Sequence, residues 1–133
     1  KLDDAGMAIV ILPGNHDCLS ADSVYRRGGL ADVPNVHVLG INSEEEWTAP
    51  ELELEVWGRP HLDYSDYSPL ANPRQRTTRW QIAMAHGHWV RNDGDRHRSW
   101  LIHDQEIAAL RQTTREAILD QSRENLRRIF KIK

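Results

Sequence analysis

Two short apolar segments of the chain run directly into turns that carry glycine and histidine. Met7–Leu12 is rich in β-branched residues and leads into Pro13-Gly14-Asn15-His16-Asp17, and Trp80–Ala85 leads into His86-Gly87-His88. A short continuous apolar run closed by turn residues predicts a strand that is covered on both faces. Because open α/β sheets bind ligands at the carboxyl ends of their strands, we expect both turns at a ligand-binding edge.

The remaining sequence predicts an α/β fold in which short strands alternate with helices. Glu51–Trp57 alternates strictly between glutamate and apolar residues, which predicts a half-buried strand of the antiparallel type. Gly28-Gly29 should stop a short helix, Asp104 should cap a second one, and Thr113 with Glu116 fits the capping box of a third. The expected strands are 36–39 and 100–102, the expected helices 20–27, 104–110 and 113–130, and the expected loops 44–50, 59–79 and 91–98.

Composition excludes several classes of protein. The longest apolar run is strand-sized, so we expect no membrane span. The single cysteine, Cys18, excludes an internal disulfide framework, and the acidic start at Asp3-Asp4 does not resemble a secretory signal. We therefore expect a cytoplasmic protein. The simplest role for its tryptophans is core and sheet packing, at Trp47, Trp57, Trp80, Trp89 and Trp100.

Charge is divided unevenly along the chain. Residues 1–110 carry 10 basic and 17 acidic side chains (−7), whereas 111–133 carry 7 and 3 (+4). The basic tail offers a weakly supported hypothesis of contact with nucleic acid or another acidic surface. Arg74, Arg76 and Arg79 either contact phosphate or form a solvated loop face.

Histidine is the commonest metal-binding side chain, but an isolated histidine is usually a solvated loop residue. His37, His61, His97 and His103 lack a partner pattern and are assigned to that ordinary class. Asn15-His16-Asp17 alone is also compatible with an Asx turn that binds no ligand. Two strands are each followed by a histidine turn. On spacing alone, a metal site and ordinary loop structure are about equally well supported.

The two turns together resemble motifs of the calcineurin-like metallophosphoesterase family. That family carries D-x-H, G-D-x-x-D, G-N-H-[DE], H and G-H-x-H, each in a loop after a strand. Gly14-Asn15-His16-Asp17 matches the third motif, and His86 in Met84-Ala85-His86-Gly87-His88 matches the fourth. The resemblance covers roughly residues 7–110 and implies part of a four-layer sandwich, with two β-sheets flanked by helices.

The resemblance also implies a chemistry and a set of roles. The activity would be hydrolysis of a phosphomonoester or phosphodiester at two divalent metal ions, Mn, Fe or Zn. Asn15 and His86 would be metal ligands, and His88 would be a further ligand or a phosphate contact. His16 would act as general acid or stabilise transition-state charge. Asp17 would hold the imidazolium of His16, directly or through the backbone turn.

Other parts of the family pattern have no counterpart in the chain. D-x-H and G-D-x-x-D are expected upstream of residue 7, and Gly94-Asp95-Arg96-His97 does not fit G-H-x-H. We therefore expect residues 1–110 to be the C-terminal portion of a phosphoesterase domain. A reading-frame shift or a truncation near Leu110 would explain the basic helical tail 111–133, and a divergent C-terminus is the alternative. A non-catalytic binding or scaffold remnant is the alternative function. An open sheet edge predicts marginal stability or association.

Overall fold

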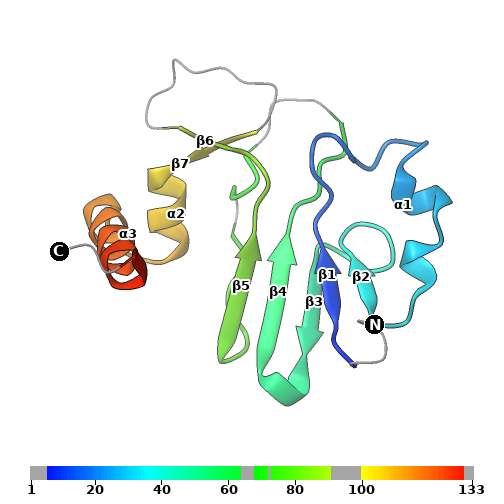
Figure 1. Ribbon diagram of the computed structural model, residues 1–133, viewed down its shortest axis with the longest axis horizontal. Coiled ribbons are helices and arrows are strands. Elements are labelled where there is room, and N and C mark those ends of the chain that lie inside the picture. The colour runs from blue at the N-terminus through cyan, green and yellow to red at the C-terminus, as the bar shows by residue number, and fades with distance from the viewer. Residues whose placement is uncertain (1–5, 64–67, 72, 91–99, 131–133) are drawn as a thin grey trace.

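The computed structural model describes residues 6–63, 68–71, 73–90 and 100–130, with only the backbone of Phe130 included. These residues form a mixed α/β arrangement of small sheets and helices (Figure 1). This agrees with the predicted fold class at the level of α/β. The elements are β1 (Ile9–Ile11), α1 (Val24–Arg27), β2 (Val36–Val38), β3 (Glu46–Ala49), β4 (Leu54–Gly58), β5 (Trp80–Met84), β6 (His88–Val90), β7 (Leu101–His103), α2 (Asp104–Leu110) and α3 (Arg115–Phe130).

The N-terminal unit consists of β1, α1 and β2. The two strands are parallel, with Ile9 opposite Val36, and α1 ends at Gly28 as predicted. Their core contains Leu19, Tyr25 and Val38. The predicted strand at Met7–Leu12 is confirmed, but its predicted burial on both faces is wrong, because all three residues of β1 are half-buried.

The central sheet has the order β3-β4-β5, with β3 antiparallel and β5 parallel to β4. Two predictions fail here. Glu46–Ala49, predicted as loop, is β3, and the first half of the predicted strand Glu51–Trp57 is the turn of the β3–β4 hairpin. Pro50 starts a 3-10 turn and Glu53 adopts the left-handed conformation, with φ of 48°. The turn that starts at Pro50 thus delays the start of the strand, although the alternation of glutamate and apolar residues runs through the turn.

Strand β5 is confirmed but is less buried than predicted. Trp80 is 58% exposed and Ile82 is 49% exposed, because β5 lies at the edge of the sheet as described. Of the expected core and sheet packing, the core part is therefore wrong for Trp80 and for Trp89, which lie on strands but are exposed, Trp89 by 45%. It is right for Trp57 and Trp100.

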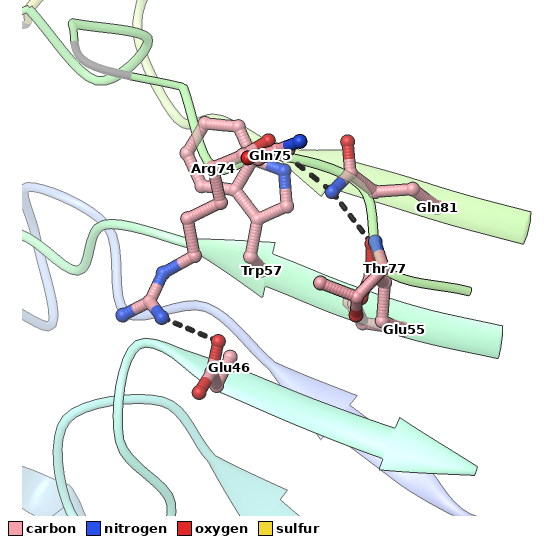
Figure 2. Close-up of a pocket in the computed structure, with 8 residues that line it drawn as sticks. Glu46, Glu55, Trp57, Arg74, Gln75, Thr77 and Gln81 are labelled. Carbon is pink, nitrogen blue, oxygen red and sulfur yellow. Dashed lines mark hydrogen bonds and ion pairs between the residues drawn. The ribbon is translucent and has the colours of Figure 1, made fainter. Parts of the chain in front are cut away.

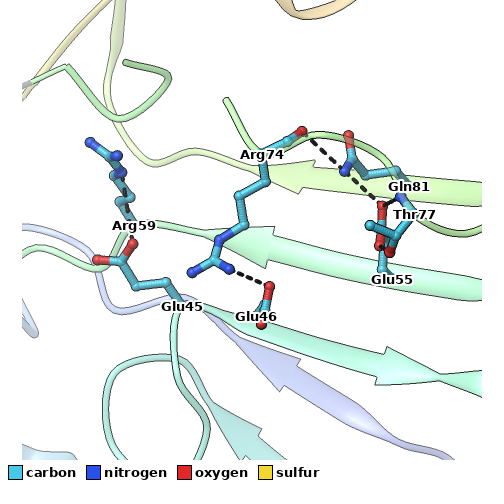
Figure 3. Close-up of polar contacts among 7 residues, drawn as sticks. All are labelled: Glu45, Glu46, Glu55, Arg59, Arg74, Thr77 and Gln81. Atoms are coloured by element: carbon cyan, nitrogen blue, oxygen red, sulfur yellow. Dashed lines mark hydrogen bonds and ion pairs between the residues drawn. The ribbon is translucent and has the colours of Figure 1, made fainter. Parts of the chain in front are cut away.

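Residues 73–79 cross the central sheet, and polar contacts hold them there. They cover a cavity of about 240 Å³, whose lining side chains are shown in Figure 2. The backbone N–H and hydroxyl of Thr77 donate to the carboxylate of Glu55, and Arg74 forms an ion pair with Glu46 (Figure 3). Gln81 donates to the same carboxylate at 2.8 Å. The predicted irregular loop is therefore an ordered segment in this part.

The C-terminal elements follow the prediction closely. Strand β7 pairs in parallel with β6, a strand that was not predicted. Helix α2 spans the predicted residues, but its N-cap is His103, with Glu106 completing the capping box. Thr114, one residue after the predicted cap, accepts from the N–H of Ala117 at the start of α3. The predicted turn at 91–98 lies outside the described residues. No helix in the part of the chain described here is both long and apolar enough to cross a membrane.

Candidate functional site

Three chain segments meet at the carboxyl ends of β1, β4 and β5. The segment after β1 contains Gly14-Asn15-His16-Asp17, the segment after β4 contains His61, and His86 follows β5. Two backbone hydrogen bonds join the first two segments: His61 N–H donates to the carbonyl of Pro13 at 3.1 Å, and Leu19 N–H donates to the carbonyl of His61 at 2.8 Å. The arrangement of strand ends that the sequence predicted for Asn15 and His86 therefore exists.

Asn15 and His86 form the centre of this cluster. Oδ1 of Asn15 lies 2.9 Å from Nε2 of His86, within hydrogen-bond distance. Asn15 is buried, whereas His86 is exposed. The imidazole packs directly on Gly14, where an added Cβ would lie 2.9 Å from Cε1 of His86. The glycine of the motif thus leaves room for the His86 ring in its present position, and its φ is not positive.

His61 belongs to the cluster although sequence analysis assigned it to the ordinary histidines. Its side chain is only 1% exposed and stacks on Trp100, with ring centroids 3.3 Å apart. Nε2 of His61 lies 3.2 Å from the carbonyl oxygen of His86, and the two imidazole rings meet edge to face at 5.4 Å. Burial lowers the pKa of His61, and the hydrogen bond to the His86 backbone opposes this shift only in part. The imidazole of His61 is therefore neutral, and it contacts the backbone carbonyl of His86.

One sequence signal could have identified His61. It follows a strand that ends at Gly58 and Pro60, which is the same context as the two histidine turns that were singled out. The interpretation failed because the alternating pattern of 51–57 suggested an antiparallel strand only, whereas β4 also pairs in parallel with β5. Parallel pairing places the carboxyl ends of both strands at one edge.

Asp17 stabilises the turn that carries His16. One of its oxygens accepts from the N–H of Gly14 at 2.8 Å, and the other accepts from the hydroxyl of Tyr25. Burial, together with the carboxylate of Asp17, raises the pKa of Tyr25 to about 12, so that the phenol remains a donor at neutral pH. Of the two alternatives for Asp17, these contacts favour action on His16 through the backbone turn. His16 itself is exposed to solvent.

His88, the weaker candidate, is exposed at the first position of β6. Its backbone N–H donates to the carbonyl of Trp100 at 2.6 Å. The intervening Gly87 is needed there, because an added Cβ would lie 2.5 Å from the same carbonyl oxygen. The glycine between the two histidines thus lets β7 approach closely.

The donor atoms of Asn15 and His86 fit one edge of a metal coordination sphere. Amide oxygen and imidazole nitrogen are both accepted by Mn, Fe and Zn. Two ligand atoms about 2.1 Å from one cation lie about 3 Å apart at right angles and about 3.4 Å apart at the tetrahedral angle of zinc sites; the observed separation is 2.9 Å, which is that of a hydrogen bond. Within residues 6–63, 68–71, 73–90 and 100–130, no group of three or more His, Cys, Asp or Glu side chains is arranged to hold a metal ion. A complete site therefore needs further donors.

Comparison with known proteins gives no further assignment, since no family model, curated protein or solved structure matches the chain.

Proposed function

We propose that this chain contributes half of the two-metal site of a phosphoesterase that resembles the calcineurin-like family, within part of a four-layer α/β sandwich. The observation that carries the proposal is the convergence of Asn15 and His86, two ligand-type side chains, from the ends of two different strands. Two further contacts hold the same segments: the part-buried hydrogen bond from Tyr25 to Asp17 and the stack of the buried His61 ring on Trp100. A divalent cation in such a site supplies Lewis-acid polarisation of phosphoryl oxygens and a water of lowered pKa.

Each side chain of the cluster has a separate role in this proposal. Asn15 and His86 bind one cation through Oδ1 and an imidazole nitrogen. His16 projects from the exposed side of the same turn, where it donates a proton to the leaving-group oxygen or stabilises negative charge that develops there. Asp17 fixes the turn through Gly14, so that His16 and Asn15 keep their relative positions.

The test compares variants of the gene product that contains this chain, with Mn and two aryl phosphodiesters. Asn15→Ala and His16→Ala should each lower the rate, His16→Ala by about 10²–10⁴-fold. If His16 is the general acid, this loss is greater for phenol than for p-nitrophenol as leaving group, because the better leaving group needs less protonation. His37→Ala, which removes a histidine outside the three strand-end segments, is the control. Full activity of both site variants would refute the assignment.

A non-catalytic binding or scaffold protein is the second candidate function. The small number of metal ligands favours it. Among the described residues, Asn15 and His86 lie together, but no group of three His, Cys, Asp or Glu side chains does. Titration of the purified chain with Mn or Zn separates the two candidates. Tight binding of two ions per chain would exclude the scaffold function, and failure of the complete gene product to hydrolyse either diester would support it.

A further inference from the structure

A second and larger cavity lies away from the candidate site. Its volume is about 950 Å³, and it is bounded by β5, the segment 73–79 and the C-terminal end of α2. Figure 1 shows α2 beside the β5 edge. In the described structure it is not lined by the side chains of the candidate site, which are Asn15, His16, Asp17, His61 and His86. A volume of this size is at the upper end of the range for sites that bind small molecules.

The cavity is strongly basic. Among the described residues, four arginines and no aspartate or glutamate line it; the arginines are Arg74, Arg76, Arg79 and Arg111. Arg74 pairs with Glu46, and Arg79 lies 3.8 Å from Glu53, so these two charges are partly neutralised. Arg76 and Arg111 have no ion-pair partner among the described residues. Because the whole chain carries a net charge of −3, this positive surface is local.

An exposed aromatic ring lies among these charges. Trp80 is 58% exposed, and the guanidinium of Arg79 lies 5.4 Å from the centre of its ring. A solvent-exposed indole beside arginines is the combination with which proteins bind single-stranded nucleic acids: bases stack on the ring and cations follow the phosphates. Gln75 and Gln81 line the same cavity, where the amide nitrogen of Gln81 already donates to Glu55 and to the Arg74 carbonyl.

The wall that carries Arg74, Arg76 and Arg79 is fixed on the sheet. Thr77 lies in the middle of this segment and is held by Glu55 through its backbone and its hydroxyl. The opposite wall, including Arg111, follows the hydrogen-bonded last turn of α2, where Arg111 N–H donates to Ile107 at 3.1 Å. Both walls are therefore ordered before a ligand binds, which reduces the entropic cost of binding.

We propose that this cavity is a binding site for single-stranded nucleic acid. Arg76 and Arg111 contact phosphates, and Trp80 stacks on a base. Binding requires no metal ion and does not depend on the hydrolytic function proposed above. The proposal differs from contact through the basic tail, because only Arg111 of the residues 111–133 has a role as a cation in it.

The test measures binding of a fluorescein-labelled 12-nucleotide oligo-dT to the complete 133-residue chain by fluorescence anisotropy, at 50 mM and 200 mM NaCl. Arg76→Ala/Arg111→Ala should weaken binding at least tenfold and reduce the salt dependence by about 1.4 in log–log slope. Trp80→Ala should weaken it by about 5- to 150-fold. The control is Arg123→Ala/Arg127→Ala, two arginines on the exposed face of α3, which should leave binding unchanged. Thermal melting establishes that all variants are folded.

Four results would overturn the proposal. The first is no binding by the unmodified chain at 50 mM NaCl. The second is loss of binding only in the α3 control, which would place the contact on the tail. The third is equal competition by inorganic polyphosphate together with no effect of Trp80→Ala, which would indicate a general polyanion surface. The fourth is equally tight binding of double-stranded DNA of the same length.

Discussion

Oδ1 of Asn15 lies 2.9 Å from Nε2 of His86, although 71 positions separate the two residues in the sequence. Parallel pairing of β5 with β4 and the backbone hydrogen bonds between Pro13, His61 and Leu19 bring their segments together. The contact therefore depends on the tertiary fold. Substitutions in the residues that hold the two segments together should disturb the contact although Asn15 and His86 themselves are unchanged.

Gly14→Ala should displace the His86 ring. The new methyl group would lie 2.9 to 3.1 Å from three atoms of the imidazole, which is too close for an undisturbed ring. Because the His86 side chain is exposed and can move, we expect a loss of no more than about 1 kcal/mol in the free energy of unfolding but a changed environment of His86, measured by urea denaturation and by the NMR signals of its ring. Unchanged His86 signals in Gly14→Ala would contradict the prediction.

His61→Ala should destabilise the site and the fold together. The substitution removes a side chain that is 1% exposed and stacked on Trp100, so we expect a cost of about 2–4 kcal/mol in unfolding free energy. His61→Phe should restore much of this loss, because the ring still stacks, but not the contact with the His86 carbonyl. Urea denaturation measures the first effect, and the NMR signals of His86 measure the second. A loss below about 1 kcal/mol for His61→Ala would show that the stack contributes little.

Local signals in the sequence predicted much of the fold. Glycine and proline residues predicted α1, and continuous apolar runs predicted β1 and β5, to within a few residues. These features depend on neighbouring residues, so the sequence contains the information directly. These local signals did not predict burial, because the exposure of Trp80 and Ile82 depends on which strands pair beside β5.

The failures have a common cause in tertiary context. Glu51 and Leu52 continue an alternating pattern, but Pro50 and the left-handed Glu53 turn the chain there. His61 shares the strand-end context of the two histidine turns, but its place in the site depends on contacts with segments far away in the sequence. Asn15 and His86 do lie together, in keeping with the expectation that turns after strands gather at one ligand-binding edge.

Glu55 should make stability depend on acid pH. Partial burial opposes ionisation of its carboxylate, but hydrogen bonds from Thr77 and Gln81 outweigh burial and lower the pKa of Glu55 below its ordinary 4.5. Folding therefore favours the ionised form. Its contribution to stability is present above about pH 4.5 and is lost as the pH falls through the lower pKa of the folded state.

Glu55→Gln tests this dependence. The variant should lose about 1 kcal/mol of unfolding free energy at pH 7 and should lose less than the unmodified chain between pH 6 and pH 3. Melting temperatures measured across this range provide the comparison, with Glu51→Gln in the exposed hairpin turn as control. Parallel pH profiles for the unmodified chain and Glu55→Gln would show that the Thr77 and Gln81 contacts do not favour the charged carboxylate.

Asp104 should contribute more to stability than a helix-capping residue does. The sequence predicted it as a cap, but His103 holds that position, and Asp104 is a carboxylate only 2% exposed. It accepts from the Trp89 indole and from Nε of Arg115 at 2.7 Å, so it joins β6, α2 and α3. Asp104→Ala removes the acceptor of two donors, and we expect a cost of about 2–4 kcal/mol in unfolding free energy.

Asp120→Ala is the matched control for this prediction. Asp120 also accepts from an arginine, Arg123, at 3.1 Å, but its side chain is 74% exposed. Water replaces that exposed partner, so the cost should stay below about 0.5–1 kcal/mol. Urea denaturation followed by circular dichroism measures both variants. Equal costs would mean that burial does not strengthen the Asp104 contacts, whereas a larger cost for Asp104→Ala would identify it as the residue that fixes the two C-terminal helices to β6.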